Sequence, residues 1–186
     1  EADQKVQVTY YQELDSDHDW ASYVYPLATT TTPQVDSKVS GKFAMSVDIR
    51  VIRDRLPREI ADLESEARRE GHLHIARLID EWSAGDIRFE RGGERLLGAY
   101  VGEALAGVGG VTVEPALSQA LRMRRFYVSP EMRGHGIGRL LALALLNHAR
   151  DFCSVVTVHP GNPGAAKFWE ALGFRPHAPD GDMLYV

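Results

Sequence analysis

Hydrophobic and polar residues follow a regular order along the chain from Val47 onward. The stretch VDIRVI alternates apolar and polar residues, which is the pattern of a half-buried strand. The next two stretches, PREIADLESEARREG and HIARLIDEWSAG, each place apolar residues on one helical face and end at a glycine. Residues 47–85 therefore predict one strand followed by two helices.

The remainder of the chain predicts three more strands and then two helix–strand units. RLLGAYV, ALAGVGGVTVEP and LRMRRFYVSP are strand-like. The helix GIGRLLALALLNHAR then precedes a buried-strand run, SVVTVHP, and the helix NPGAAKFWEALGF precedes a last strand, DMLYV. This order, β-α-α-β-β-β-α-β-α-β, predicts an α/β fold of the α+β kind, in which helices flank a mixed sheet.

The composition of the chain changes near residue 45. Residues 1–44 contain four of the seven tyrosines and no arginine, whereas arginine is frequent after Met45. We therefore expect 1–44 to be an N-terminal extension or leader of unknown role, and 45–186 to be the functional domain. Two interpretations stay open: a non-native leader ahead of a start at Met45, or a two-stranded extension formed by KVQVTYYQEL and SYVYPLATTTT.

Charge and cysteine content limit the class of protein. The net charge of −5 disfavours nucleic-acid binding, which usually needs a basic surface. A single cysteine, Cys153, leaves no intrachain disulfide and no cysteine-based zinc site, and His72 and His74 more often flank a helix start than hold a metal. No apolar run approaches the ~20 residues that span a bilayer, and the N-terminus lacks signal-peptide features. We expect a cytoplasmic enzyme or binding protein with no metal and no membrane partner.

The stretch RRFYVSPEMRGHGIGRLL carries the most informative motif. Gly134, Gly136 and Gly138 lie between a strand-like run and an apolar helical run. A Walker loop is excluded because no Gly-Lys-[Ser/Thr] follows, and the dinucleotide fingerprint is excluded because Arg139 stands where a glycine is required. Glycines let backbone N–H groups approach an anion at a helix N-terminus, and Arg133 and Arg139 would add charge. The glycines alone fit a pyrophosphate cradle and a plain turn about equally.

A second stretch, VHPGNPGAAKFWEALGF, completes a known pattern. Asn162 precedes a helix that ends in Gly-Phe, and Arg133, Gly136 and Gly138 match [Arg/Gln]-x-x-Gly-x-[Gly/Ala]. Over about Val47–Val186 the chain resembles the GNAT superfamily of acetyl-CoA-dependent N-acetyltransferases. The resemblance implies the GNAT-type acyl-CoA N-acyltransferase fold, whose central mixed sheet has two strands splayed apart at the cofactor slot.

The resemblance also implies which residues bind acetyl-CoA. They are Phe126 and Val128 on the strand, Arg133, Gly134, His135, Gly136, Ile137, Gly138 and Arg139 in the loop, and Asn162 and Phe168 in the later helix. The loop amides would bind the pyrophosphate. Backbone groups of a bulge in the strand would pair with the pantetheine arm and polarise the acetyl carbonyl, and the later helix would pack along that arm.

The catalytic acid and base are less clearly indicated. Many family members have a tyrosine in the later helix where this chain has Trp169, and some have a strand glutamate where it has Thr157. The substitute candidates are His159, Tyr127 and Glu114. A solvated strand-end histidine, a packed core tyrosine and water-relayed deprotonation are the alternative interpretations.

The sequence thus predicts an N-acetyltransferase that moves an acetyl group from acetyl-CoA to a primary amine by direct attack and releases CoA. The amine would belong to a small molecule or a peptide. A non-catalytic acyl-CoA-binding or regulatory module on the same fold is the alternative. Acidic residues such as Glu64, Glu66, Glu70 and Asp80 would attract a cationic amine or simply face water. Because dimers are common in the family, a homodimer is one expectation.

Overall fold

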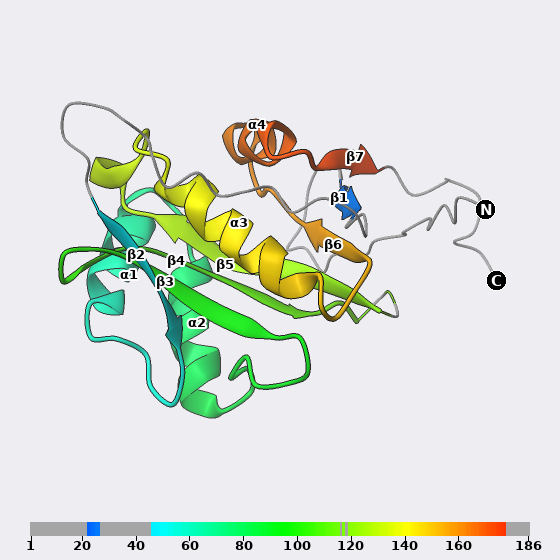
Figure 1. The fold of residues 1–186 in the computed structure, drawn as a ribbon. Coiled ribbons are helices and arrows are strands. Elements are labelled where there is room, and N and C mark those ends of the chain that lie inside the picture. The colour runs from blue at the N-terminus through cyan, green and yellow to red at the C-terminus, as the bar shows by residue number, and fades with distance from the viewer. Residues whose placement is uncertain (1–21, 27–45, 116, 118, 178–186) are drawn as a thin grey trace, which may run out of the picture.

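The computed structural model describes residues 22–26, 46–115, 117 and 119–177. One mixed sheet runs through the molecule in the order β2-β3-β4-β5-β6-β1-β7 (Figure 1). Its strands are β1 (Ser22–Pro26), β2 (Val47–Ile52), β3 (Arg95–Val101), β4 (Ala104–Val113), β5 (Ala120–Val128), β6 (Val155–Val158) and β7 (Arg175–His177). The helices are α1 (Ile60–Arg69), α2 (His74–Ala84), α3 (Ile137–Ala149) and α4 (Pro163–Ala171), with a short 3-10 turn η1 (Pro130–Met132).

Helices cover both faces of the sheet. Figure 1 shows α3 across one face and α1 and α2 behind the other. Leu141 and Leu145 of α3 are fully buried in one hydrophobic core, and Leu63 of α1 and Leu78 of α2 are buried in the other. The pairing of β5 with β6 is parallel and the remaining pairings are antiparallel. The predicted mixed sheet flanked by helices is therefore confirmed.

The helix ends follow the signals in the sequence. α2 stops at Gly85, which adopts φ = 83° and closes the helix in the left-handed region. α4 begins after Asn162, whose side-chain oxygen accepts a hydrogen bond from the Ala165 N–H at 2.8 Å. Among the described residues, no helix is both long and apolar enough to cross a membrane.

The strand β1 comes from the N-terminal segment and lies between β6 and β7. Tyr23 stands opposite Val158 on one side and Pro176 on the other, and both pairings are antiparallel. SYVYPLATTTT thus does contain a strand, but this strand joins the main sheet. KVQVTYYQEL and the predicted last strand DMLYV lie outside the described residues. The sequence did not predict β7, which is short and carries no apolar alternation.

A β-bulge interrupts the pairing of β4 with β5. The register shifts between Val108 and Gly110, so two residues of β5, Arg125 and Phe126, stand opposite Gly109 alone. Arg125 adopts φ = 54°, a left-handed conformation that is uncommon for a residue other than glycine. The extra residue bends the strand locally, as bulges do.

The bulge moves the side chains that follow it to the opposite faces of the sheet. Leu121 and Met123 pack into the core beside α3, as strand alternation requires. Without the bulge, Tyr127 would share that face. With it, Phe126 and Val128 lie on the α3 side, while Tyr127 packs into the core beneath α1 and α2. One inserted residue therefore determines which side chains reach each helical layer.

β5 and β6 separate partway along their length. They pair from Ala120–Val155 to Met123–Val158. Residues 124–128 have no strand partner on this side within the described part of the chain, and the two strands diverge in Figure 1. The backbone of β5 is thus exposed along one edge beside the gap.

Gly109 gives a test of the packing at the bulge. A Cβ at this position would lie 2.5 Å from Cδ2 and 3.0 Å from Cε2 of Phe126. We expect Gly109→Ala to destabilise the protein by about 1–3 kcal/mol, because the packed ring must shift. The control Gly92→Ala places its Cβ more than 4 Å from any other group, so its effect should stay within about 0.5 kcal/mol. Urea unfolding measures both, and equal midpoints would show that the ring is not held against Gly109.

Candidate active site

The loop between β5 and α3 forms a cradle of backbone N–H groups. Gly134 and Gly136 adopt φ = 81° and 79°, and Gly136 immediately precedes α3. The Leu140 N–H donates to the Gly136 carbonyl at 3.0 Å. In the described part of the chain, the N–H groups of residues 134–139 have no backbone acceptor. Such an array at a helix N-terminus binds anions, because the free N–H groups and the helix dipole both favour negative charge.

Aromatic rings from α4 form a wall beside the cradle. A Cβ at Gly138 would lie 3.4 Å from the Phe168 ring and 3.6 Å from Val128, so α3 begins in contact with α4. The ring centroid of Phe126 lies 5.8 Å from that of Phe168 and 4.9 Å from that of Trp169. The α3 side of the gap is therefore apolar next to the cradle.

The backbone of Val128 faces the gap. Ser129 donates its N–H to the carbonyl of Ala106 on β4 at 2.9 Å. Because successive residues of a strand direct their backbone groups to opposite sides, the N–H and C=O of Val128 point away from β4. The carbonyl accepts a hydrogen bond from Nε of Arg133 at 3.0 Å. The N–H of Val128 is thus directed into the gap.

The side chain of Arg133 extends to the end of α1 and does not enter the cradle. Its Nη1 and Nη2 donate to Oε1 and Oε2 of Glu70 at 2.7 and 2.6 Å, and the Tyr127 hydroxyl donates to Oε2 at 2.6 Å. The hydrogen bonds from Arg133 and Tyr127 lower the pKa of Glu70 to about 2. Burial and the bond to Glu70 raise the pKa of Tyr127, so its hydroxyl stays protonated at neutral pH. The network ties the loop to α1.

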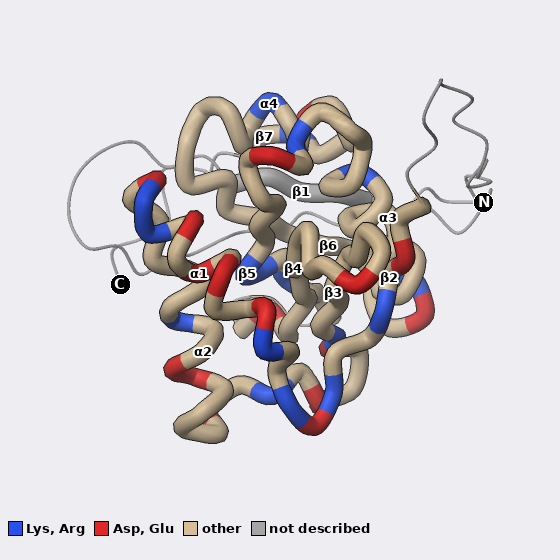
Figure 2. Tube along the Cα trace, turned by 90° about the vertical axis from the view of Figure 1, so that its left-hand side faces the viewer, with Lys and Arg blue, Asp and Glu red and all other residues tan. Residues whose placement is uncertain are grey.

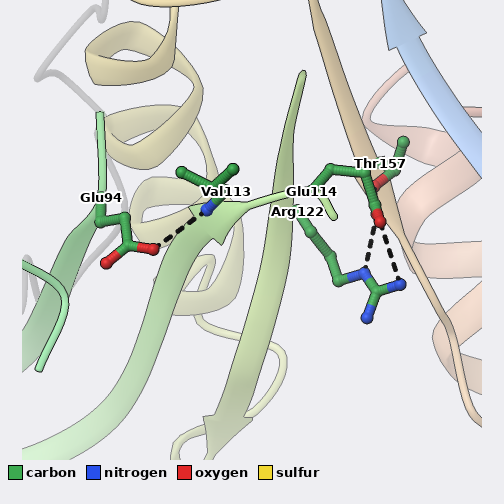
Figure 3. Close-up of polar contacts among 5 residues, drawn as sticks. All are labelled: Glu94, Val113, Glu114, Arg122 and Thr157. Atoms are coloured by element: carbon green, nitrogen blue, oxygen red, sulfur yellow. Dashed lines mark hydrogen bonds and ion pairs between the residues drawn. The ribbon is translucent and has the colours of Figure 1, made fainter. Parts of the chain in front are cut away.

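Glu114 lies at the closed end of the gap, directly after β4. Its side chain is buried, and Oε2 accepts from Nε of Arg122 at 2.8 Å and from Oγ1 of Thr157 at 3.0 Å (Figure 3). Arg122 and Thr157 are opposite each other, one position before the Met123–Val158 pair where β5 and β6 part. The carboxylate therefore links β4, β5 and β6 where they are closest.

His159 follows β6 directly, where the chain turns away from β5. The side chain is half-buried, and burial lowers its pKa to about 4. The imidazole is therefore neutral at pH 7 and can accept a proton. The structure thus gathers the loop, Phe126, Val128 and Phe168 at one end of the gap, whereas Tyr127 and Glu114 are engaged elsewhere.

Two residues near this site were not predicted as part of it. The sequence predicts that Glu70 attracts a cationic amine or faces water, whereas in the structure it binds both Arg133 and Tyr127. His74, the first residue of α2, places its ring centroid 5.8 Å from that of Tyr127, and burial lowers its pKa to about 4. The HLH stretch was the only sequence signal for His74, and it does flank a helix start. No group of three or more potential ligands among the described side chains could hold a metal ion.

Comparisons with known proteins give one family model and several solved structures of similar fold. The chain matches the family model described as Acetyltransferase (GNAT) family over residues 58–174. No curated protein matches the sequence significantly. A structure of a proposed acetyltransferase from Exiguobacterium sp. 255-15 is 23% identical and aligns with a TM-score of 0.66, covering 73% of this chain and 89% of that one. An acetyltransferase structure from Streptococcus agalactiae 2603 is 19% identical with a TM-score of 0.56, covering 77% and 92%. At such identities these structures establish the similarity of fold.

The buried ion pair at Glu114 provides a second test. We expect Glu114→Gln to destabilise the protein by about 3 kcal/mol, because it leaves the charge of Arg122 without its buried partner. The matched control is Glu64→Gln, which removes a surface pair with the exposed Arg68 and should cost less than about 1 kcal/mol. Urea unfolding at pH 7 measures the difference. If Glu114→Gln is as stable as the control, the Glu114 carboxylate does not hold β4, β5 and β6 together.

Proposed function

We propose that the chain, which belongs to the Acetyltransferase (GNAT) family, is an N-acetyltransferase that uses acetyl-CoA. It transfers the acetyl group to a primary amine of a small molecule or a peptide. The observation that carries the proposal is the cradle of N–H groups at residues 134–139, placed at the mouth of the gap between β5 and β6.

The cradle suits the pyrophosphate of acetyl-CoA. A Cβ at Gly134 or Gly136 would meet nothing within 4 Å, so the space over these residues is open to a bulky anion. The start of α3 adds its positive dipole end, and Arg139 in the first turn of that helix is exposed. Because Glu70 holds the side chain of Arg133, this arginine contributes by fixing the loop and the Val128 carbonyl.

The open edge of β5 suits the pantetheine arm. An extended ligand with amide groups can pair with an exposed strand edge in the way that an added strand does. Phe126 and Phe168 provide an apolar wall for its methylene groups. The side-chain oxygen of Asn162 is engaged by Ala165, so its NH₂ group is the part that can donate to the arm.

The chemistry in this proposal is direct acyl transfer. The acceptor nitrogen bonds to the thioester carbon of acetyl-CoA as the C–S bond breaks, and no covalent intermediate with the protein is needed. The N–H of Val128 can donate to the carbonyl oxygen as negative charge develops, an interaction worth about 3 kcal/mol in comparable sites. A protonated amine, with a pKa of ~10, must first lose a proton. His159 is neutral at pH 7, and because burial makes it a weak base, it acts by passing that proton on to water.

Tyr127 and Glu114 take no proton in this scheme. The Tyr127 hydroxyl already donates to Glu70, and its raised pKa makes it a poor acid. The Glu114 carboxylate is buried against Arg122 and Thr157. Both are assigned structural roles.

One observation favours a second function, acyl-CoA binding without catalysis. Trp169, at the position where many relatives have a tyrosine, is only 3% exposed and packs edge-on against Phe168 and Phe174. It cannot donate a proton to a departing thiolate. Binding of acetyl-CoA with no thiol release across a broad amine panel would support this second function against the first.

A substitution in the cradle tests cofactor binding. We expect Gly136→Glu to weaken acetyl-CoA binding about 100-fold or more, because it places bulk and negative charge where the pyrophosphate would lie. The matched control is Gly85→Glu. Gly85 shares the left-handed conformation and open surroundings of Gly136 but lies at the end of α2. Isothermal titration calorimetry on both folded variants measures the dissociation constants of acetyl-CoA. Equal constants for Gly136→Glu and Gly85→Glu would show that the cradle does not bind the pyrophosphate.

Replacement of His159 tests the proton acceptor. We expect His159→Gln to lower kcat by about 100-fold or more while the dissociation constant of acetyl-CoA is unchanged. The lowered pKa keeps the wild-type imidazole neutral down to about pH 4. Titration of His159 should therefore cause no change in the rate of thiol release between pH 5 and 8. The measurement is the pH profile of thiol release for both proteins. Equal turnover at every pH would exclude His159 as the base.

A further inference from the structure

Arg124 differs from the neighbouring arginines of β5 in having no counter-ion. Arg122 is paired with Glu114, and Nε of Arg125 donates to Oε2 of Glu81 on α2 at 3.2 Å. Arg124 has neither an ion pair nor a hydrogen-bonded side-chain partner among the described residues. Its side chain is half-buried, and its pKa is lowered by burial and then by the charges of Arg125 and Arg122, while the more weakly acting carboxylates of Glu81 and Glu114 oppose this shift. The chain thus holds a cation in partial burial beside two others.

Arg124 lies at the vertex of the gap. It is the first residue of β5 beyond the last pair with β6, Met123–Val158. Its electrostatic neighbours include Glu81 of α2, which places the guanidinium on the α1–α2 side of the sheet. The cradle and Phe168 are on the α3 side. An acceptor amine that approaches from the side opposite the cofactor would therefore meet Arg124.

Two acidic residues on this side are held in ion pairs, whereas Glu66 of α1 makes no ion pair among the described residues. Figure 2 shows acidic positions along α1 and α2 beside the basic positions of β5. Glu70 binds Arg133 and Tyr127, and Glu81 binds Arg125. Glu66 lies near Tyr127, and its Oε2 is buried with no hydrogen-bond partner among the described residues, so this side carries an unpaired carboxylate as well as the unpaired cation of Arg124.

A partly buried charge without a partner is costly, and a bound anion relieves that cost. The planar guanidinium matches a carboxylate with two parallel N–H···O bonds. We propose that Arg124 binds a carboxylate of the acceptor, so that the acceptor is an amine that also carries a carboxylate, as in an amino acid or a short peptide. This inference rests on the proposed acetyltransferase function.

The distance along β5 is consistent with an acceptor of this size. Arg124 and Val128 are four residues apart, which in a strand is about 13 Å at roughly 3.3 Å per residue. The bulge at Arg125 shortens this path. The length that remains between a carboxylate at Arg124 and an amine near the Val128 N–H determines whether an amino acid or a dipeptide fits better.

Matched substrates test the inference directly. Thiol release from acetyl-CoA is measured with L-alanine against L-alaninamide, and with alanyl-alanine against its C-terminal amide. Spermidine and kanamycin serve as amines without a carboxylate. We expect kcat/KM at least about tenfold higher for the carboxylate member of the preferred pair, equivalent to 1.4 kcal/mol. The two pairs distinguish an amino acid from a peptide.

The outcomes separate this inference from the function on which it rests. Equal or faster reaction of the amides or polyamines would overturn the role of Arg124 and leave the acetyltransferase function standing. Acetyl-CoA binding without thiol release from any amine in a broad panel would overturn the acetyltransferase function, and this inference with it.

Substitutions of Arg124 provide a second test of the inference. We expect Arg124→Gln to raise KM for the carboxylate acceptor about 10- to 100-fold, with the dissociation constant of acetyl-CoA and the turnover of the amide unchanged. Arg124→Lys keeps the positive charge but loses the planar guanidinium that can donate two parallel hydrogen bonds. Its KM for the carboxylate acceptor should lie between those of the wild type and of Arg124→Gln. Arg68→Gln, in the exposed pair on α1, is the control and should match the wild type.

Stability distinguishes a binding role from a structural one. Removal of an unpaired cation beside Arg122 and Arg125 relieves repulsion, so Arg124→Gln should unfold at the same urea concentration as the wild type or higher. A lower unfolding midpoint together with an unchanged KM would show that Arg124 only supports the fold, and would overturn the inference.

Discussion

The β-bulge in β5 is the constraint on which both sides of the site depend. A non-glycine residue in the left-handed region costs about 1–2 kcal/mol, and Arg125 adopts that conformation while its side chain pairs with Glu81. Gly109 leaves room for the ring of Phe126 on the other face. The bulge thereby directs Phe126 toward the α3 side of the sheet and leaves the N–H of Val128 facing the gap. Strand geometry, rather than any single catalytic side chain, creates the slot.

The arginines in and after β5 hold the elements around this slot in place. The pairs are Arg122 with Glu114 after β4, Arg125 with Glu81 of α2, and Arg133 with Glu70 after α1. Each pair connects a different neighbour to β5 or its loop, so the strand edge and the cradle are positioned before any ligand binds. Such preorganisation lowers the entropy that binding must overcome. Arg124 stands apart because it makes no such pair with any described residue.

Local patterns in the sequence predicted most of the fold. The buried stripe of α1, formed by Ile60, Leu63 and Ala67, depends only on helical spacing, and the glycines of the loop indicated a turn before α3. The contacts that build the site are different in kind. Glu70 and Arg133 are 63 positions apart, and Glu114 and Thr157 are 43 apart. No periodicity records which distant charges meet, so the burial of Glu114 and the part played by Glu70 could not be predicted.

The position of β1 has a consequence for the order of folding. This strand is the first of the described strands, yet its two partners, β6 and β7, are the last two of them in the sequence. Pairings so remote in sequence form slowly, because the chain must close a large loop before any contact stabilises it. During translation β1 emerges with both edges unpaired and has to wait for β6 and β7. The described sheet is therefore completed only once β6 and β7 have been made, although β1 precedes every other described strand.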